Sequence, residues 1–187
     1  MELSWWYTAA WITMIVVWVI GALGTKNTAR SEPPGRRFGH MFLVLLGAWL
    51  FFTPRVPGAL RMRLLPDTRS IFWFGVVLTW MGIAFAIWAR ATLGRNWSGM
   101  VEVKQAHKLI VAGPYRIVRH PIYSGILLAL LGTALGIGEL KSFVALPLFF
   151  AAWLTKSRHE EEFMRQQFGN DYAAYQSKVK ALIPGVM

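Results

Sequence analysis

The sequence predicts an all-α, polytopic membrane protein with five transmembrane helices. Of its 187 residues 55% are hydrophobic, ten are Trp, and apolar runs recur along the chain. A soluble domain of this length is typically about half apolar and contains far fewer Trp residues, so a membrane protein is the better class. The sequence contains no cysteine, which excludes disulfides, thiolate metal sites and cysteine nucleophiles.

Five apolar runs are the candidate crossings, since a spanning helix needs about 20 apolar residues. They cover residues 5–24, 38–53, 71–89, 122–138 and 142–155. The first and third runs carry no charge, whereas the second is shorter and includes His40. The last two are shorter still and flank the polar turn Glu139-Leu140-Lys141, so we expect a helical hairpin. The first run has neither a basic start nor a cleavage pattern, which predicts an anchor and not a removed signal peptide.

The basic residues predict the orientation of the chain. Five crossings place the termini on opposite sides, and a cytoplasmic C-terminus divides the 20 Lys and Arg residues 15 to 5 in favour of the cytoplasm. The N-terminus is then expected on the opposite side. Topology and anionic lipid account for the net charge of +11, which argues against a nucleic-acid partner. An unexpected load of four arginines, Arg55, Arg61, Arg63 and Arg69, falls in an outer loop.

The chain reads as a single domain over residues 1–187, because no internal repeat or long linker divides it. Residues 1–89 are predicted to be membrane scaffold helices. Nearly all the chemistry falls in residues 90–187, which comprise a polar connector, the hairpin and a tail. Within the hairpin, Gly132 and Gly136 are four residues apart, which predicts a close helix contact.

The tail is predicted to form an amphipathic helix. Apolar residues recur there at helical spacing, at Met164, Phe168, Tyr172, Tyr175 and Val179. Such a helix would lie on the membrane surface or pack over the connector. The triplet Gly169-Asn170-Asp171 interrupts the run and provides a candidate start for a new helix.

Arg119 and His120 stand directly before Pro121, which is well tolerated in the first turn of a helix. The positive end of the following helix dipole would then face the connector. Antiparallel hairpin geometry brings Glu160 and Glu161 to the same membrane face. A cationic group, Arg119, and an anionic glutamate at the same membrane face suit a zwitterionic ligand such as an amino-acid moiety. The other interpretation is that Arg119 pairs with Glu160 or Glu161 and stabilises the base of the hairpin.

These residues belong to a larger set of motifs. They are Leu-Gly-Arg-Asn-Trp-Ser at 93–98, His107-Lys108-Leu109, Gly113-Pro114-Tyr115-Arg116, Arg119-His120-Pro121-x-Tyr123, Glu160-Glu161, Phe168-Gly169-x-x-Tyr172-x-x-Tyr175 and Leu182-Ile183-Pro184. In this combination the sequence resembles the isoprenylcysteine carboxyl methyltransferase family of integral membrane enzymes. The motifs cover the second half of the chain, and the first half agrees in the number and length of its segments.

The resemblance implies a cytoplasmic site for S-adenosylmethionine and a lipophilic acceptor that enters from the bilayer, such as the carboxylate of a C-terminal isoprenylcysteine or a similar small lipid. It implies catalytic roles for Arg119, Glu161 and Asn96. The implied cofactor-binding residues are His107, Lys108, Leu109, Gly113, Tyr115, Arg119, His120, Pro121, Tyr123, Glu160 and Glu161. Asn96 has a second interpretation, a capped turn beside an interfacial Trp.

Metal chemistry is not expected, because the histidines show no ligand spacing of the His-Glu-x-x-His kind. Three other functions stay open at this point. A phospholipid N-methyltransferase would use the same cofactor, a membrane reductase would use NADPH, and a non-enzymatic scaffold would use neither.

Overall fold

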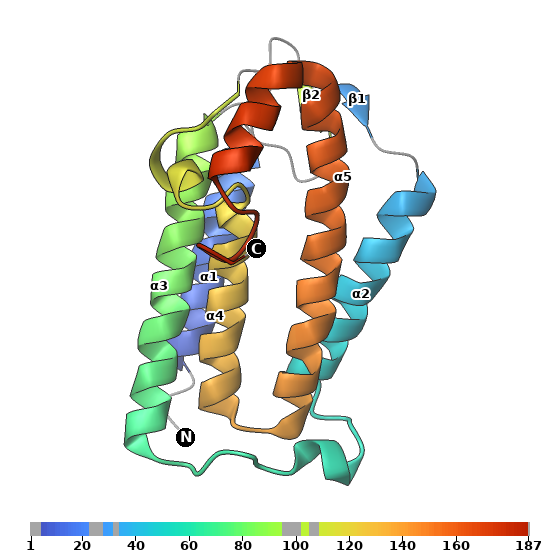
Figure 1. Ribbon diagram of the computed structural model, residues 1–187. Coiled ribbons are helices and arrows are strands. Elements are labelled where there is room, and N and C mark those ends of the chain that lie inside the picture. The colour runs from blue at the N-terminus through green and yellow to red at the C-terminus, as the bar shows by residue number, and fades with distance from the viewer. Residues whose placement is uncertain (1–4, 23–27, 32–33, 95–101, 105–108, 187) are drawn as a thin grey trace.

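The computed structural model describes residues 5–22, 28–31, 34–94, 102–104 and 109–186, with the backbone alone at 28–31, 34–37 and 102–104. Within these ranges five long helices form an elongated bundle (Figure 1). They are α1 (Trp5–Ala22), α2 (Pro34–Phe52), α3 (Arg69–Leu93), α4 (Pro121–Ile137) and α5 (Leu140–Lys178). Each contains one of the predicted apolar runs or coincides with it to within two residues at its C-terminal end, so the predicted all-α class is confirmed. The sequence did not predict the small antiparallel pair of strands, β1 (Thr28–Ser31) and β2 (Glu102–Lys104).

Two of the described helices, α1 and α3, are long and apolar enough to cross a membrane. The apolar part of α2, Phe38–Phe52, and all of α4 are shorter. Large apolar side chains on the outer surface of the bundle are exposed, among them Ile15 and Val19 on α1 and Phe42 and Leu45 on α2. An apolar surface of this extent is typical of a region covered by lipid or by another protein.

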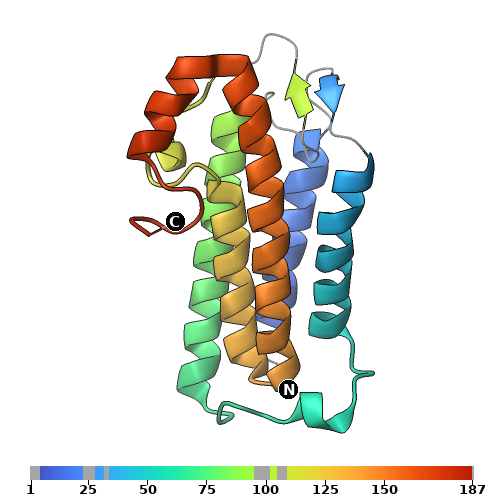
Figure 2. The same ribbon diagram turned by 45° about the vertical axis from the view of Figure 1, so that its right-hand side comes forward.

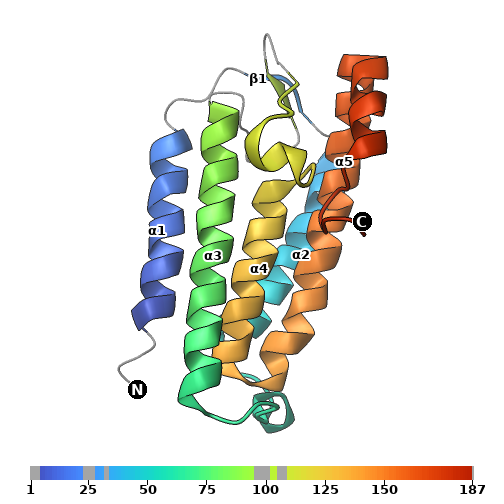
Figure 3. The same ribbon diagram turned by 60° about the vertical axis from the view of Figure 1, so that its left-hand side comes forward.

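Helices α3 and α4 make the most extensive helix contact in the bundle, with α1 beyond α3 (Figure 3). Small residues permit this contact: a Cβ on Gly125 would come within 2.6 Å of the carbonyl oxygen of Gly82, and one on Gly132 within 2.5 Å of the Thr79 nitrogen. The hydroxyls of Thr79 and Thr133 lie 3.2 Å apart across the same interface. The predicted close helix contact is therefore confirmed at Gly132 and at Gly136. At Gly136 the neighbours are Tyr7 of α1 and Gly75 of α3, whose added Cβ would come within 3.1 Å of the Gly136 nitrogen.

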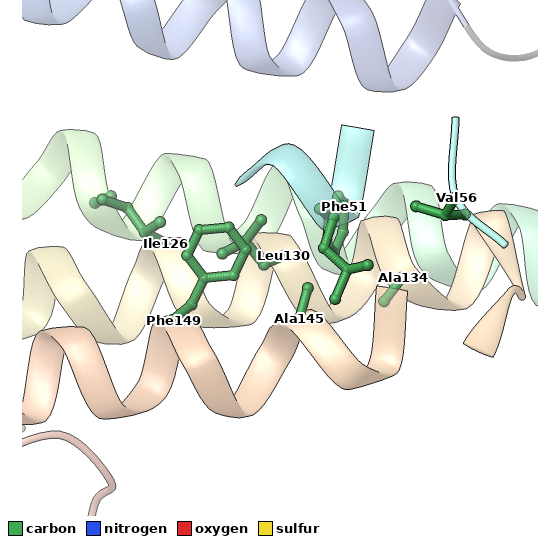
Figure 4. Packing of buried hydrophobic residues seen from close by; sticks show 9 residues of the cluster. Phe51, Val56, Ile126, Leu130, Ala134, Ala145 and Phe149 are labelled. Carbon is green, nitrogen blue, oxygen red and sulfur yellow. The ribbon is translucent and has the colours of Figure 1, made fainter. Parts of the chain in front are cut away.

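The hydrophobic core joins α2, α3, α4 and α5 (Figure 4). Its buried members are Leu50, Phe51, Val56, Ala86, Ile126, Leu130, Ala134, Ala145 and Phe149. The rings of Phe51 and Phe149 meet nearly edge to face, with centroids 6.1 Å apart, which is a favoured aromatic geometry. The predicted hairpin of α4 and α5 is present, but its two helices pack chiefly on α3 and α2 respectively.

The turn between α4 and α5 is tighter than the predicted polar turn at 139–141. Gly138 ends α4 in the left-handed conformation (φ 67°), and Glu139 is already the residue that precedes α5. Lys141 therefore lies in the helix, where its Nζ donates to the carbonyl of Thr53 at 2.8 Å. The same Nζ lies 3.3 Å from the Glu139 carboxylate. These contacts attach the turn to the chain that follows α2.

Helix α5 changes direction near its end, where Gly169 has φ 49° and ψ −120°. The last turns fold back over the connector (Figure 2), and the Tyr175 hydroxyl donates to the carbonyl of Tyr115 at 2.6 Å. The predicted interruption is confirmed at Gly169, and of the two predicted positions for the tail the one over the connector is observed. The predicted single apolar face is wrong, because the reversal separates Met164 from Tyr172. Val179 lies just beyond the last helical residue.

Candidate functional site

The candidate site is built around the N-terminus of α4, as the Arg-His-Pro sequence predicts. Pro121 is the first helical residue and His120 is the N-cap. A proline fits here because its missing N–H has no partner in the first turn of a helix. The bend between the connector and α4 thereby directs Arg119 and His120 towards α5.

The C-terminal segment of the chain fixes the backbone at this bend. The backbone N–H of Arg119 donates to the carbonyl of Lys180 at 2.8 Å, and that of His120 to the carbonyl of Ala181 at 2.9 Å. One turn later, the hydroxyl of Ser124 donates to the carbonyl of Leu182 at 2.6 Å. These bonds satisfy polar groups that would otherwise be buried without partners, and they hold the start of α4 against the tail.

Arg119 and Glu161 form a nearly buried ion pair. Both Nε and Nη2 of Arg119 contact Oε1 of Glu161, at 2.8 and 2.7 Å. The two side chains are only 10% and 8% exposed. The Nη1 group of Arg119 donates to the backbone carbonyls of Gln176, at 3.3 Å, and Val179. Of the two sequence interpretations, the one in which Arg119 pairs with a glutamate describes the observed contact.

His120 bridges the two glutamates. Its Nδ1 lies 3.3 Å from Oε2 of Glu160, and its Nε2 lies 3.1 Å from Oε1 of Glu161. The hydroxyl of Tyr123 donates to the other oxygen of Glu160 at 2.5 Å. The structure thus brings together five of the predicted site residues, Arg119, His120, Tyr123, Glu160 and Glu161, which we call the polar cluster.

Electrostatics favour the charged forms of three members of the polar cluster, His120, Glu160 and Glu161. Burial alone would lower the pKa of His120, but its hydrogen bonds to Glu160 and Glu161 outweigh burial and raise that pKa above 6.5. Burial alone would raise the pKa of each glutamate. The favourable interactions with His120, together with Lys156 near Glu160 and Arg119 beside Glu161, outweigh burial and lower the pKa of both glutamates.

Gln176 is a member of this network that the sequence did not reveal. Its Nε2 donates to Oε2 of Glu161 at 2.7 Å, and its Oε1 accepts from Nε of Arg165 at 3.0 Å. The one available signal was its position a single helical turn after Tyr172. With Gln176, both oxygens of Glu161 are engaged by donors within the protein.

A stack of near-parallel rings connects the polar cluster to the hydrophobic core. The ring centroids of His120 and Tyr123 are 5.6 Å apart, those of Tyr123 and Trp153 are 6.3 Å apart, and those of Trp153 and Phe149 are 5.5 Å apart. The Nζ of Lys156 lies 5.5 Å from the centroid of Tyr123, within cation–π range. The stack therefore extends without a break from His120 of the polar cluster to Phe149 of the hydrophobic core.

The other predicted site residues are distributed around this centre. Gly113 and Tyr115 lie in the 3-10 helix Gly113–Arg116, where Tyr115 is buried and holds the tail through its carbonyl. Leu109 precedes that helix and is half-buried. Asn96, His107 and Lys108 lie outside the described residues. Among the described residues, no group of three or more His, Asp and Glu side chains could hold a metal ion.

Comparison with known proteins identifies the family. The family model described as phospholipid methyltransferase matches residues 70–171, from the start of α3 to the tail of α5. This is more than half of the chain, which therefore belongs to that family. The match includes all five residues of the polar cluster.

Curated relatives agree with this assignment. The chain is 34% identical to proteins named "Probable protein-S-isoprenylcysteine O-methyltransferase" in two subspecies of Oryza sativa, over 65% of this chain and 66% of theirs. It is 30% identical to "Protein-S-isoprenylcysteine O-methyltransferase B" of Arabidopsis thaliana, over 65% of this chain and 64% of that protein. The aligned region thus spans just under two thirds of the length of these relatives. The family resemblance noted in the sequence is thus confirmed.

Proposed function

We propose that this protein is an integral membrane methyltransferase that transfers a methyl group from S-adenosylmethionine to a lipophilic acceptor. One observation carries the proposal. The family match covers α3, α4 and most of α5, and these same elements bring Arg119, His120 and both glutamates together beside the core. A structural ion pair alone would not require a second carboxylate, a bridging histidine and a stack of aromatic rings.

The polar cluster has the chemistry to bind the amino-acid end of S-adenosylmethionine. Glu160 is the more open carboxylate, with 20% of its side chain exposed against 8% for Glu161. We propose that Glu160 faces the positively charged end of the cofactor. Because Glu161 is fully engaged by Arg119, His120 and Gln176, we assign it and Arg119 to positioning. The proposed contributions of Asn96, His107 and Lys108 remain predictions.

The bound cofactor supplies an electrophilic methyl group. The task left to the protein is to orient the acceptor and to exclude water. Correct positioning of two reactants alone can lower a barrier by about 7–11 kcal/mol. A carboxylate acceptor is already ionised at neutral pH, so its attack needs no general base. The polar cluster therefore has to hold its ligand rather than move protons.

We propose the carboxylate of an isoprenylcysteine as the acceptor, and this is supported by the printed names of the rice and Arabidopsis relatives. The partly exposed rings of Tyr123 and Trp153 would offer apolar contacts to a prenyl chain. The lipophilic acceptor would enter from the bilayer between helices.

We further propose five crossings, with the C-terminus and the polar cluster on the cytoplasmic side and the N-terminus opposite. The 15 to 5 division of basic residues supports this orientation. Protease accessibility of a tag at each terminus, in sealed vesicles, tests it. Cleavage of both tags from the same side would exclude an odd number of crossings.

Phospholipid N-methylation is the second candidate, and the description of the family favours it. The two acceptors differ in proton chemistry. An amine must lose a proton before it attacks, so its rate should rise with pH up to the amine pKa, whereas a carboxylate should react at a nearly constant rate above about pH 5.

A panel of ligands and acceptors tests the proposal. Purified protein in detergent is heated with S-adenosylmethionine, S-adenosylhomocysteine or NADPH. A ligand at 100 times its Kd adds about 2.7 kcal/mol to the native state, which raises the unfolding temperature measurably. We expect a response to both adenosyl ligands. Methyl transfer to a farnesylcysteine analogue, but not to phosphatidylethanolamine, would support the isoprenylcysteine proposal. A response to NADPH alone, or to none of the three, would overturn the methyltransferase proposal.

A further inference from the structure

The four arginines that the predicted orientation left unexplained lie together at the end of the bundle opposite the polar cluster. They belong to residues 53–69, the segment that follows α2 and ends with the first residue of α3, which we call the arginine loop. In Figure 1 this segment runs along the lower end of the helices, while the tail of α5 is at the upper end. Any role of the arginine loop is therefore separate from that of the polar cluster.

The arginine loop is a firmly held element. Backbone bonds join it to the turn between α4 and α5: the N–H of Leu64 donates to the carbonyl of Gly138 at 2.8 Å, and the N–H of Leu140 to the carbonyl of Met62 at 2.9 Å. Val56 is buried in the hydrophobic core. Because the backbone is held in this way, the same side chains always point away from the bundle.

Those outward side chains combine positive charge with apolar groups. Arg55, Arg61, Arg63 and Arg69 are all exposed. Between the described residues, one ion pair involves these arginines, the contact of Arg63 with Asp67 at 3.7 Å. Two large apolar side chains next to the arginines, Met62 and Leu64, are 57% and 46% exposed. Long basic side chains next to exposed apolar ones are typical of a protein surface at a lipid interface.

An independent observation locates that interface. Aromatic residues gather on the helix ends next to the arginine loop. Trp5 and Trp6 begin α1, Trp49 is in the last turn of α2, and Trp73 is in the first turns of α3. The rings of Trp6 and Trp73 are in contact, with centroids 5.7 Å apart. Trp is enriched at the boundary between hydrocarbon and headgroups. The arginine loop lies beyond these Trp residues along the long axis of the bundle, which places it at the level of the lipid phosphates.

We propose that the arginine loop binds the phosphates of anionic phospholipids in the leaflet opposite the polar cluster. The occupant is a lipid and not a free anion, since the exposed Met62 and Leu64 would remain uncovered by a soluble phosphate. The proposal requires that α1 and α3 cross the membrane, but it does not depend on the reaction that the protein catalyses. It also explains why the basic residues on that side are concentrated in one loop.

The test compares lipids on the intact protein in detergent micelles. Phosphatidylglycerol, phosphatidylcholine with the same acyl chains, and soluble glycerol phosphate are titrated while the unfolding temperature is followed. We expect phosphatidylglycerol to raise the unfolding temperature most, with an effect that weakens as salt is added. An equal shift with phosphatidylcholine, or with glycerol phosphate, would overturn the proposal.

Matched variants locate the effect. The triple variant R55Q/R61Q/R69Q should weaken the apparent affinity for phosphatidylglycerol about 100-fold, at about fivefold per arginine. The variant R55K/R61K/R69K keeps the charge and should retain most of the response. R116Q/R158Q/K178Q removes the same charge from exposed sites at the other end of the molecule and should change the affinity by less than about fivefold. Equal losses in both glutamine variants would show an effect of net charge and would contradict a site in the arginine loop.

Discussion

Arg119 and Glu161 meet through a single carboxylate oxygen, which accepts from both Nε and Nη2 of the guanidinium at 2.8 and 2.7 Å. The opposite oxygen of Glu161 accepts from Gln176. The ion pair therefore joins three parts of the chain, namely the start of α4, the middle of α5 and the folded-back tail. Its loss should affect both stability and ligand binding.

Replacement of Arg119 should lower the stability of the folded protein. Arg119→Ala leaves the Glu161 carboxylate buried without its cationic partner, and breaking a buried pair in this way typically costs about 3–5 kcal/mol. We expect a loss of that order in the free energy of unfolding, measured by denaturant unfolding in detergent. Arg158→Ala is the control, since Arg158 is exposed on α5, the helix that carries Glu161. This change should cost less than about 0.5 kcal/mol. Similar losses in the two variants would show that the ion pair is not a stabilising contact.

The polar cluster should make stability depend on pH. The pKa of His120 is raised in the folded state, so its stabilising effect is complete below the ordinary value of 6.5 and is lost as the pH rises through the folded pKa. The glutamate pKa values are lowered, so their stabilising effect is complete above 4.5 and is lost as the pH falls through the folded values. The cluster is therefore most stabilising between these two pH values.

Unfolding temperatures measured from about pH 5 to about pH 9 check this dependence. The wild type should lose stability on the alkaline side, and His120→Gln should flatten that part of the curve. An unchanged alkaline slope in His120→Gln would mean that another group titrates there.

Two glycines in different surroundings should respond in opposite directions to the same substitution. Gly125→Ala would place a Cβ within 2.6 Å of the Gly82 carbonyl, and such overpacking typically costs about 1–3 kcal/mol. Gly39, in α2, has nothing within 4 Å of the added atom. Gly39→Ala should therefore stabilise the helix by about 0.5–1 kcal/mol. Thermal unfolding of both variants checks the contact between α3 and α4, and a neutral Gly125→Ala would exclude the close approach.

Gly169 should be needed for the reversal of α5. Its φ of 49° with ψ −120° is rarely adopted by residues with a side chain, so Gly169→Ala should cost about 1–3 kcal/mol. Because the reversal brings Gln176 to Glu161, the variant should also bind S-adenosylhomocysteine more weakly. Asn170→Ala changes the exposed neighbour and serves as the control in a titration of ligand binding. Equal affinities of both variants for the ligand would separate the reversal from the site.

The apolar pattern was sufficient to predict the positions of the helices, because burial in lipid or in the core selects continuous apolar runs. The meeting of Arg119 with the glutamates was also predictable, since two antiparallel helices joined by a short turn must place their far ends side by side. Pro121 marked the start of α4 for a local steric reason. These inferences depend on local sequence patterns and on the pairing of two helices that follow one another directly in the chain.

Other features depend on contacts between distant segments and were not predictable in this way. Nothing in the tail alone shows that the chain after Gly169 returns to the bend at Arg119, or that Gln176 reaches Glu161. The packing of α4 on α3 depends on small residues on both helices. The sequence pattern indicated only the pair on α4, Gly132 and Gly136, and not Gly75 and Gly82 on α3. The sheet of β1 and β2 joins segments too short to carry a strand pattern.

Direct binding of S-adenosylhomocysteine, measured by calorimetry on the purified protein, tests most directly whether the polar cluster is the cofactor site. The wild type should bind, and Glu160→Gln should weaken the Kd about 10- to 100-fold, as expected for the loss of a hydrogen bond to a charged group. Glu162→Gln, which changes the exposed glutamate directly after Glu161, should bind as the wild type does. No binding by the wild type, or equal binding by Glu160→Gln, would contradict this assignment.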